Sequence, residues 1–214
     1  MERKVDINSW PRKGQYDLFR QMDYPHFNVC AQLDITKFYT FVKAKNISFY
    51  TAMIYITTKI ANEIKEFRYR IRGQEVVEHE RIHPSFTILS KPEVFSFCSV
   101  NFSQNYQDFS QNAEEKRKDL QGHVNLDDEP GRDDSIYITS LPWVSFTSVS
   151  HPVHLKSVDS IPRIAWGKYE KERERVKIPF SVQVNHALMD GYHVGRYFEM
   201  MQEALDRPEE HIEL

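Results

Sequence analysis

Strand-like alternation is concentrated in the middle of this chain, and helical spacing of apolar residues occurs near both ends. Residues 49–64 and 192–205 carry apolar side chains three or four positions apart, which is the spacing of an amphipathic helix. The segments between them that read as strands are residues 69–77 (a hairpin), 85–89, 94–102, 135–146, 164–169 and 178–185. This order predicts an α+β fold, a two-layer mixed β-sheet covered by helices.

The length of 214 residues favours one domain over residues 1–214, and no internal repeat or low-complexity linker divides the sequence. The two cysteines, Cys30 and Cys98, lack CxxC spacing, so we expect neither a metal site nor a disulfide framework. The first ten residues lack the apolar run of a signal peptide. No stretch approaches the roughly 20 apolar residues that span a bilayer. We therefore expect a cytoplasmic protein without a membrane partner.

Charge and glycine content exclude two other classes of protein. The chain has 28 Lys and Arg against 31 Asp and Glu, a net charge of −3, which is not the basic footprint of a nucleic-acid binder. It has only 7 Gly and contains neither GxGxxG nor GxxxxGK[ST], so neither phosphate-binding loop is available. We expect no nucleic-acid partner and no nucleotide cradle of these types.

The chemically informative segment covers residues 178–195, where an alternating strand is followed by His186 and then by Asp190 at the start of the last helix. Asp is a favoured N-cap, because its carboxylate accepts the free N–H groups of the first turn. A histidine side chain has an unperturbed pKa of about 6.5, so a neutral imidazole is available at pH 7 to accept a proton from a hydroxyl. The alternative is a buried, hydrogen-bonded histidine beside a simple cap, and a lone HxxxD favours that alternative.

The longer string at residues 183–196, QVNHALMDGYHVGR, closely resembles the active-site signature of the chloramphenicol acetyltransferase family. That family has two adjacent histidines three residues before Asp-Gly, and the second is the base; here these positions are Asn185 and His186. Dihydrolipoyl acyltransferase cores share HxxxDG, but this chain has no lipoyl-carrier segment. Other matching segments occur in the same order along the chain: residues 6–13, 32–36, 48–50, 66–71, 83–87, 94–96, 141–148 and 167–169.

The resemblance implies a fold, a reaction and an assembly. The fold is that of the CoA-dependent acyltransferases, and acetyl-CoA is the co-substrate, with no metal. His186 would deprotonate the primary hydroxyl of chloramphenicol, whose acetylation inactivates the antibiotic and gives resistance. The hydroxyl of Thr139 would stabilise the oxyanion, with Ser140 as an alternative donor that we expect to face the other way. Asp190 would pair with Arg12 to hold the active-site turn. The family is a homotrimer with active sites at subunit interfaces.

The same resemblance assigns binding residues. The CoA channel would be lined by Tyr50, Pro142, Trp143 and Lys168. The aromatic acceptor slot would be formed by Phe19, Phe27, Thr87, Phe95, Val153 and Tyr169. Besides Asn185, the chain departs from the better-known enzymes at Leu18, Phe97, His151 and Ala165.

Three hypotheses follow: acetylation of chloramphenicol, acetylation of another hydroxylated small molecule, and a non-catalytic binder of the same fold. The departures at Leu18, Phe97 and His151 favour the second. Retention of His186 and of a hydroxyl at residue 139 argues against the third. His193, which also lies within the segment of residues 178–195, is predicted on the surface of the last helix or at a subunit contact.

Overall fold

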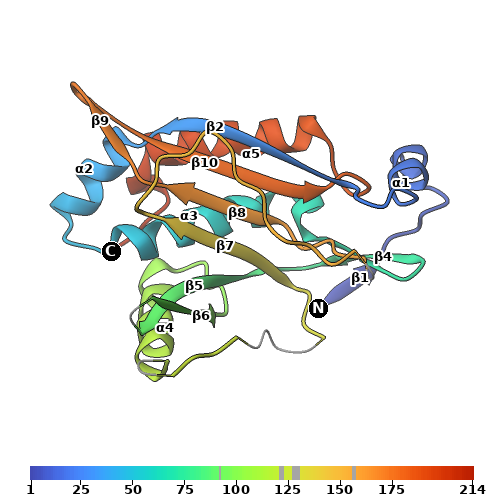
Figure 1. Ribbon diagram of the computed structural model, residues 1–214, viewed down its shortest axis with the longest axis horizontal. Coiled ribbons are helices and arrows are strands. Elements are labelled where there is room, and N and C mark those ends of the chain that lie inside the picture. Colours follow the sequence, from blue (N-terminus) through green and yellow to red (C-terminus); the bar gives the residue numbers. More distant parts are fainter. Residues whose placement is uncertain (92, 121–122, 127–130, 156–157) are drawn as a thin grey trace.

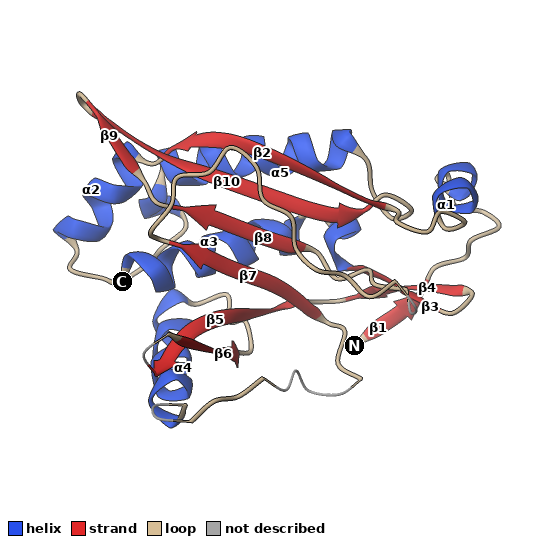
Figure 2. Cartoon of the chain, in the orientation of Figure 1, coloured by secondary structure: helices blue, strands red, loops and turns tan. Residues whose placement is uncertain are grey.

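A mixed seven-stranded sheet forms the centre of the computed structural model, which describes residues 1–91, 93–120, 123–126, 131–155 and 158–214. Its strands β5, β7 and β8 run parallel and the other neighbours pair antiparallel. The predicted α+β class with a mixed sheet is confirmed (Figures 1 and 2). In spatial order the strands are β2 (His26–Asp34), β10 (Arg175–Asn185), β8 (Arg163–Gly167), β7 (Ser135–Leu141), β5 (His83–Lys91) and β6 (Val94–Ser99), with β9 (Glu170–Glu172) paired to β10.

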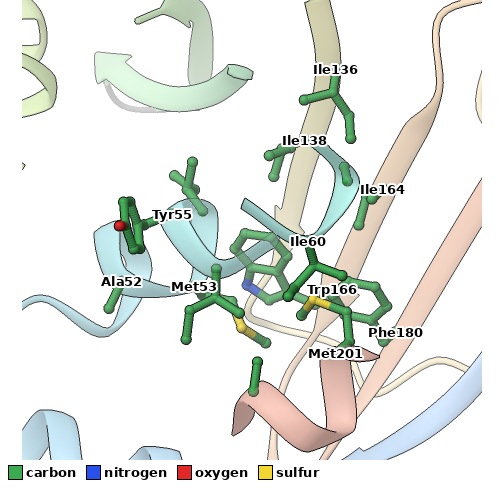
Figure 3. Close-up of a cluster of buried hydrophobic side chains, with 14 of the residues drawn as sticks. Ala52, Met53, Tyr55, Ile60, Ile136, Ile138, Ile164, Trp166, Phe180 and Met201 are labelled. Atoms are coloured by element: carbon green, nitrogen blue, oxygen red, sulfur yellow. The ribbon is translucent and has the colours of Figure 1, made fainter. Parts of the chain in front are cut away.

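Helices cover one face of this sheet. The helices α3 (Phe49–Glu63) and α5 (Gly191–Asp206) lie behind the central strands in Figure 1, with α2 (Thr36–Ala44) and α4 (Tyr106–Asp119) toward one end. The N-cap Ser48 accepts from the Thr51 amide at the start of α3, which is buried on most of its surface. Figure 3 shows Met53 and Ile60 of this helix near Trp166 and Phe180 of the sheet. These side chains are all at most 2% exposed and belong to one apolar core.

The opposite face of the sheet is crossed by the connection from β7 to β8, which the structure describes over residues 142–155 and 158–162 (Figure 1). Parallel neighbouring strands require such a crossover. The connection is hydrogen-bonded to sheet side chains, since Asn28 Nδ2 donates to the Val149 carbonyl at 2.7 Å and the His151 amide donates to Gln183 Oε1 at 2.8 Å. This face is therefore lined by polar side chains, in contrast to the apolar helix face.

A second, three-stranded sheet was not predicted in full. The hairpin of β3 (Tyr69–Arg72) and β4 (Glu75–His79) was expected, but β1 (Glu2–Lys4) adds to it as a third strand. Beside it lies α1 (Lys13–Phe19) (Figure 2). A small apolar cluster joins this sheet to the segment after β10: Trp10, Tyr16, Tyr69, Ile71, Val76, Ala187 and Leu188.

Several expected boundaries need correction. The strand expected over residues 94–102 ends at Ser99, and the strand expected over residues 135–146 ends at Leu141. The run of Asp, Glu, Pro and Gly within residues 122–134 predicts a loop, and this segment falls partly outside the described residues. Short 3-10 helices occur at η1 (Lys65–Arg68) and η2 (Pro208–Glu210). Within the described residues, no helix is long and apolar enough to cross a membrane, and no cluster of metal-binding side chains is present.

Candidate active site

The turn that carries His186 begins where β10 ends, and Asn185 holds it. The Asn185 carbonyl accepts from the amides of Leu188 and Met189 at 3.1 and 3.3 Å. Its side-chain oxygen accepts from the Ala187 amide at 3.0 Å, and its side-chain nitrogen donates to the Asp159 carbonyl at 2.9 Å. The asparagine that departs from the family signature is therefore fully engaged in shaping the turn.

The His186 imidazole is oriented by aromatic packing. Its ring stacks on Phe19, with centroids 3.8 Å apart and an interplanar angle of 7°, and it contacts Phe27 at 4.5 Å. The His186 amide donates to the Pro25 carbonyl at 2.6 Å, which fixes the backbone. The Nδ1 atom is buried and has no hydrogen-bond partner among the described residues. A general base must present a nitrogen in a fixed direction, and the packing on Phe19 supplies that constraint.

Asp190 and Arg12 form an ion pair next to the turn that carries His186. The Arg12 Nη1 atom lies 2.5 Å from Asp190 Oδ2, and its Nη2 atom donates to the His186 carbonyl at 3.4 Å. The predicted contact is thus present, and the same guanidinium also reaches the backbone of the candidate base. Burial raises the pKa of Asp190, but the hydrogen bond and charge of Arg12 outweigh it and hold that pKa below its usual value. Asp190 also caps α5 by accepting from the Tyr192 amide at 3.1 Å.

The expected position of His193 on the helix surface is wrong within one chain, and its alternative, a subunit contact, stays a prediction. Its side chain is 14% exposed, with Nδ1 2.9 Å from Asp190 Oδ1 and Nε2 3.5 Å from Glu66 Oε1. His193 is the third residue of α5 and forms a capping box with Asp190. The capping-box spacing is visible in the sequence, but the partner Glu66, in η1, lies too far along the chain to be inferred from it. Four charged or titratable side chains thus follow one another from Arg12 through Asp190 and His193 to Glu66.

A large cavity of about 2010 Å³ borders the edge where β5 and β7 separate. Their pairing ends at Phe86 and Ile138, so Thr139 and Ser140 both line the cavity although they point to opposite faces. Beyond this point the Thr87 carbonyl accepts from the Tyr50 hydroxyl at 2.6 Å. Burial raises the pKa of Tyr50, which keeps that hydroxyl protonated as a donor. The cavity exceeds the roughly 300–1,000 Å³ of an ordinary small-molecule site, which leaves room for two substrates.

The structure separates the predicted site residues into two groups. The first lines the cavity: Tyr50, Thr87, Phe95, Thr139, Pro142, Trp143, Lys168 and Tyr169. The second surrounds the turn outside the cavity: Arg12, Phe19, Phe27, His186 and Asp190. Val153 lies in the 142–162 connection and belongs to neither group. Tyr169 contacts the rings of Tyr39 and Phe49, at the helix side of the cavity.

Gly167 permits the close approach of two segments beside the cavity. A Cβ atom at this position would lie 2.6 Å from the Val144 carbonyl oxygen and 2.8 Å from Cγ of Pro179. The Lys168 amide donates to that same carbonyl at 2.8 Å. The glycine therefore allows the segment after Trp143 to lie against β8.

Sequence reasoning missed a buried ion pair in the cavity wall. Arg163 Nη2 lies 2.5 Å from Asp159 Oδ2, and the two side chains are 8% and 6% exposed. The Arg163 guanidinium lies over the Tyr137 ring, 5.4 Å from its centroid. All three residues line the cavity together with His151. Nothing in the sequence around Asp159 distinguishes it from a surface loop.

The architecture matches solved acyltransferases. A chloramphenicol acetyltransferase structure covers 96% of this chain and 100% of its own, with a TM-score of 0.85 and 24% identity. The Azotobacter vinelandii dihydrolipoamide acetyltransferase covers 92% of this chain and 88% of its own, with a TM-score of 0.71 and 15% identity. The fold is therefore that of the CoA-dependent acyltransferases, as predicted.

Sequence comparison narrows the class further. The family model described as chloramphenicol acetyltransferase matches residues 2–202. The chloramphenicol acetyltransferase of Clostridium butyricum is 31% identical over 207 residues, covering 93% of this chain and 92% of that protein. Its counterpart from Klebsiella sp is 32% identical over 205 residues, covering 94% and 93%. This chain belongs to the chloramphenicol acetyltransferase family, which confirms the resemblance seen in its motifs.

Proposed function

We propose that this protein is an acetyl-CoA-dependent O-acetyltransferase that acetylates the primary hydroxyl of chloramphenicol in the cytoplasm, with residues 1–214 as one domain. His186 accepts the hydroxyl proton as the oxygen attacks the thioester carbonyl. The tetrahedral intermediate then collapses, the CoA thiolate leaves, and the proton on His186 passes to it. Arg12 and Asp190 hold the turn, and a metal is not required by any of these steps.

The observation that carries the proposal is the fixed imidazole. The His186 ring is stacked on Phe19 at 3.8 Å, and its backbone is held by the Pro25 carbonyl and the Arg12 guanidinium. Unpartnered buried ring nitrogens also occur at His26, His151 and His211 within the described residues, so the support for the proposal is the stacked His186 ring on a backbone held at two points. This favours a catalytic role over the alternative of a hydrogen-bonded core histidine.

Thr139 is the proposed oxyanion donor. It lines the cavity at the point where β5 and β7 separate, so its hydroxyl is accessible from within. Tyr50, Pro142, Trp143 and Lys168, which share the cavity, would bind acetyl-CoA. Thr87, Phe95 and the aromatic side chains Phe19 and Phe27 beside His186 would contact the acceptor.

A homotrimer with sites between subunits accounts for the separation of these two groups. His186 does not line the cavity that contains Thr139 in the described part of one chain. Base and oxyanion donor must both lie within hydrogen-bond reach of the reacting atoms. We infer that His186 of one subunit faces the cavity of the next.

The test follows thiol release from acetyl-CoA with and without chloramphenicol. Wild-type protein should show drug-dependent release, and His186→Ala should lower it by about 10²–10⁴-fold. Thr139→Val should lower kcat by about 10²–10³-fold, while Thr139→Ser retains the donor and most of the rate. His123→Ala, which removes an exposed histidine, is the matched control and should behave as wild type. Drug-dependent release that persists in His186→Ala would show that the assigned base is wrong.

The interface model has its own experiment. Trimers reassembled from a mixture of His186→Ala and Thr139→Val chains should regain activity, because some sites then combine an intact base with an intact donor. Each variant alone stays inactive. A mixture with no activity above its components, despite subunit exchange seen with labelled chains, would place both groups in one subunit.

A different hydroxylated acceptor is the second candidate. The observation that favours it is the polar wall of the cavity formed by His151, Asp159 and Arg163. Acetylation of other alcohols, with no stimulation by chloramphenicol, would support this candidate and leave the roles of His186 and Thr139 intact.

A further inference from the structure

The side-chain amide of Asn185 connects the turn that carries His186 to a segment far from it in the sequence. Its Nδ2 atom donates to the Asp159 carbonyl at 2.9 Å, across 26 positions, and its Oδ1 atom accepts from the Ala187 amide at 3.0 Å. Asn185 is 3% exposed, so water replaces neither bond if it is lost. The backbone of the turn therefore depends on where the Asp159 carbonyl lies.

The Arg163 guanidinium holds the segment that contains this carbonyl. Its Nη1 atom donates to Asp159 Oδ1 at 3.0 Å and to the Ile161 carbonyl at 2.9 Å, and Nη2 donates to Asp159 Oδ2 at 2.5 Å. Arg163 is the first residue of β8, which pairs with β7 and with β10, so the guanidinium is attached to the middle of the sheet. A planar fork of donors can hold a side chain and a backbone carbonyl at once, which a lysine ammonium cannot do with the same fixed geometry.

Bonds to both sheets hold the neighbouring residues of this segment. The Ile71 amide of β3 donates to Ser160 Oγ at 3.0 Å, and the Tyr137 amide of β7 donates to the Pro162 carbonyl at 3.0 Å. The segment is thus tied to the small sheet, to the large sheet and, through Asn185, to the turn. A segment fixed on both sides can orient a group that is bonded to it, which is the requirement for a pre-organised site.

Stability alone does not account for an ion pair at this place. The Arg163 and Asp159 side chains are 8% and 6% exposed. Burial of two charges costs free energy of solvation, so an apolar pair of similar volume is often as stable or more stable. The ion pair has one consequence that an apolar pair would not have, because its directional contacts fix the backbone of Asp159 and with it the carbonyl that Asn185 bonds.

We propose that Arg163 and Asp159 are positioning residues, which hold the turn of His186 in place through the amide of Asn185. This inference rests on the proposed function, because it takes His186 as the base. The two side chains also line the cavity, so binding of the acceptor is the competing role. The two roles are separable, since a positioning residue acts on His186 before any substrate is bound.

Arg163→Lys keeps the buried charge and removes the fork. We expect kcat to fall by about 10- to 100-fold with little change in KM, because a displaced base slows the chemical step and leaves the binding residues in place. Arg175→Lys is the matched control, the same substitution in an exposed pair with Asp34, and should behave as wild type. Asn185→Ser, whose side chain is too short to reach the Asp159 carbonyl, should lower kcat by a similar factor.

The double variant of Arg163→Lys with Asn185→Ser tests whether both residues act along one path. Because the two substitutions break the same connection, kcat of the double variant should be close to that of Asn185→Ser alone. Reductions in kcat that multiply would show that Arg163 acts independently of Asn185, and would overturn the inference.

An NMR signal of the ligand-free protein separates this inference from the proposed function. The His186 ring stacks on Phe19 at 3.8 Å, and the ring current of Phe19 shifts the imidazole proton signals upfield. In protein labelled at the histidine Cε1 atoms, the signal that disappears in His186→Ala is that of His186. Arg163→Lys and Asn185→Ser should move this signal toward the position of an unstacked imidazole, and Arg175→Lys should leave it in place.

The position of the His186 signal in Arg163→Lys decides between the two roles. A signal that stays in place overturns the proposal, and a raised KM in the same variant then assigns Arg163 to acceptor binding. A signal that moves, in a protein without acetyl transfer, means that the proposed function fails and the positioning role stands. If Arg163→Lys does not unfold cooperatively, Asp159→Asn combined with Arg163→Met, which leaves no charge on either side chain, takes its place in every comparison.

Discussion

Replacing Arg12 by lysine removes one contact from the turn that carries His186 while keeping the charge. The guanidinium reaches two acceptors at once, Asp190 Oδ2 at 2.5 Å and the His186 carbonyl at 3.4 Å. A lysine ammonium is a point charge on a flexible stem and cannot present two donors at that fixed spacing. We expect it to remain near Asp190 and release the His186 carbonyl.

The expected loss of stability in Arg12→Lys depends on how far the contact between Arg12 and Asp190 is buried. A hydrogen bond to a charged group contributes about 1.5–3 kcal/mol, but the Asp190 side chain is 34% exposed, so water compensates part of the loss. We expect Arg12→Lys to lower the free energy of unfolding by about 1–2 kcal/mol, which is about 2–8 °C in Tm for a chain of this size. Displacement of a catalytic group by 1 Å can cost about 10²-fold, so kcat/KM should fall by about 10- to 100-fold.

Thiol-release kinetics and thermal unfolding measure the two effects separately. Lys13→Ala is the matched control, since the neighbouring Lys13 forms an exposed pair with Asp17. Exposed pairs contribute about 0–1 kcal/mol, so the control should keep both activity and Tm. Wild-type kcat/KM in Arg12→Lys, with an unchanged Tm, would refute the idea that the two-acceptor contact positions His186.

Three further predictions concern the supports of the site. His193→Ala removes the contacts to Asp190 and Glu66 and should lower kcat by about 10-fold while KM changes little. If His193 is purely structural, the substitution changes only Tm, so steady-state kinetics distinguish the two roles. Gly167→Ala places a carbon 2.6 Å from the Val144 carbonyl oxygen and should lower the free energy of unfolding by about 1–3 kcal/mol. The control is Gly195→Ala, whose Cβ would have no neighbour within 4 Å. An equal Tm in the two variants would contradict the packing argument. Burial raises the pKa of Asp159, but the hydrogen bond and charge of Arg163, with smaller effects of the His154 amide and of His26, together outweigh burial and lower that pKa below its ordinary value. The pair therefore stabilises the fold above about pH 4 and loses that effect as the pH falls through the lowered value. Asp159→Asn, which leaves Arg163 unpaired, should be destabilised by about 3–5 kcal/mol at pH 7 and by progressively less as the pH falls below about 4 in urea titrations; a pH-independent difference would refute the assignment.

Local sequence patterns predicted the elements whose stability depends on one buried face. The last helix and β10 were recognised because their apolar residues repeat with the period of a helix and of a strand. The strand ends at Asn185, and the helix begins after its N-cap Asp190. By contrast, β1 has three exposed polar residues, Glu2, Arg3 and Lys4, and shows no such period. It is held by backbone pairing to β4 and by the contact of Arg3 with Glu78, 75 positions along the chain. A strand stabilised only by distant partners leaves no local signal.

The site was predicted unevenly for the same reason. His186, Asp190 and Thr139 were proposed as site residues because they stand at fixed spacings within family motifs, and these roles stay predictions. The partnership of His193 with Glu66, and the ion pair between Asp159 and Arg163, depend on how separate segments pack. The opening of the cavity depends on where the pairing of β5 with β7 ends, which is a property of two strands and of no single segment.

The small second sheet supports the turn that carries His186. Ala187 and Leu188 pack into the small cluster with Trp10, Tyr16 and Tyr69, while Met189 packs into the main core. The turn is therefore clamped between two apolar clusters, and its residues are at most 1% exposed at these three positions. Phe19 of α1 is packed against the small cluster and stacks on the imidazole, so this cluster fixes both the backbone and the ring of His186. The orientation of the proposed base thus depends on the N-terminal segment, and Trp10→Ala should loosen the turn and lower kcat without changing any of the residues proposed to bind substrate.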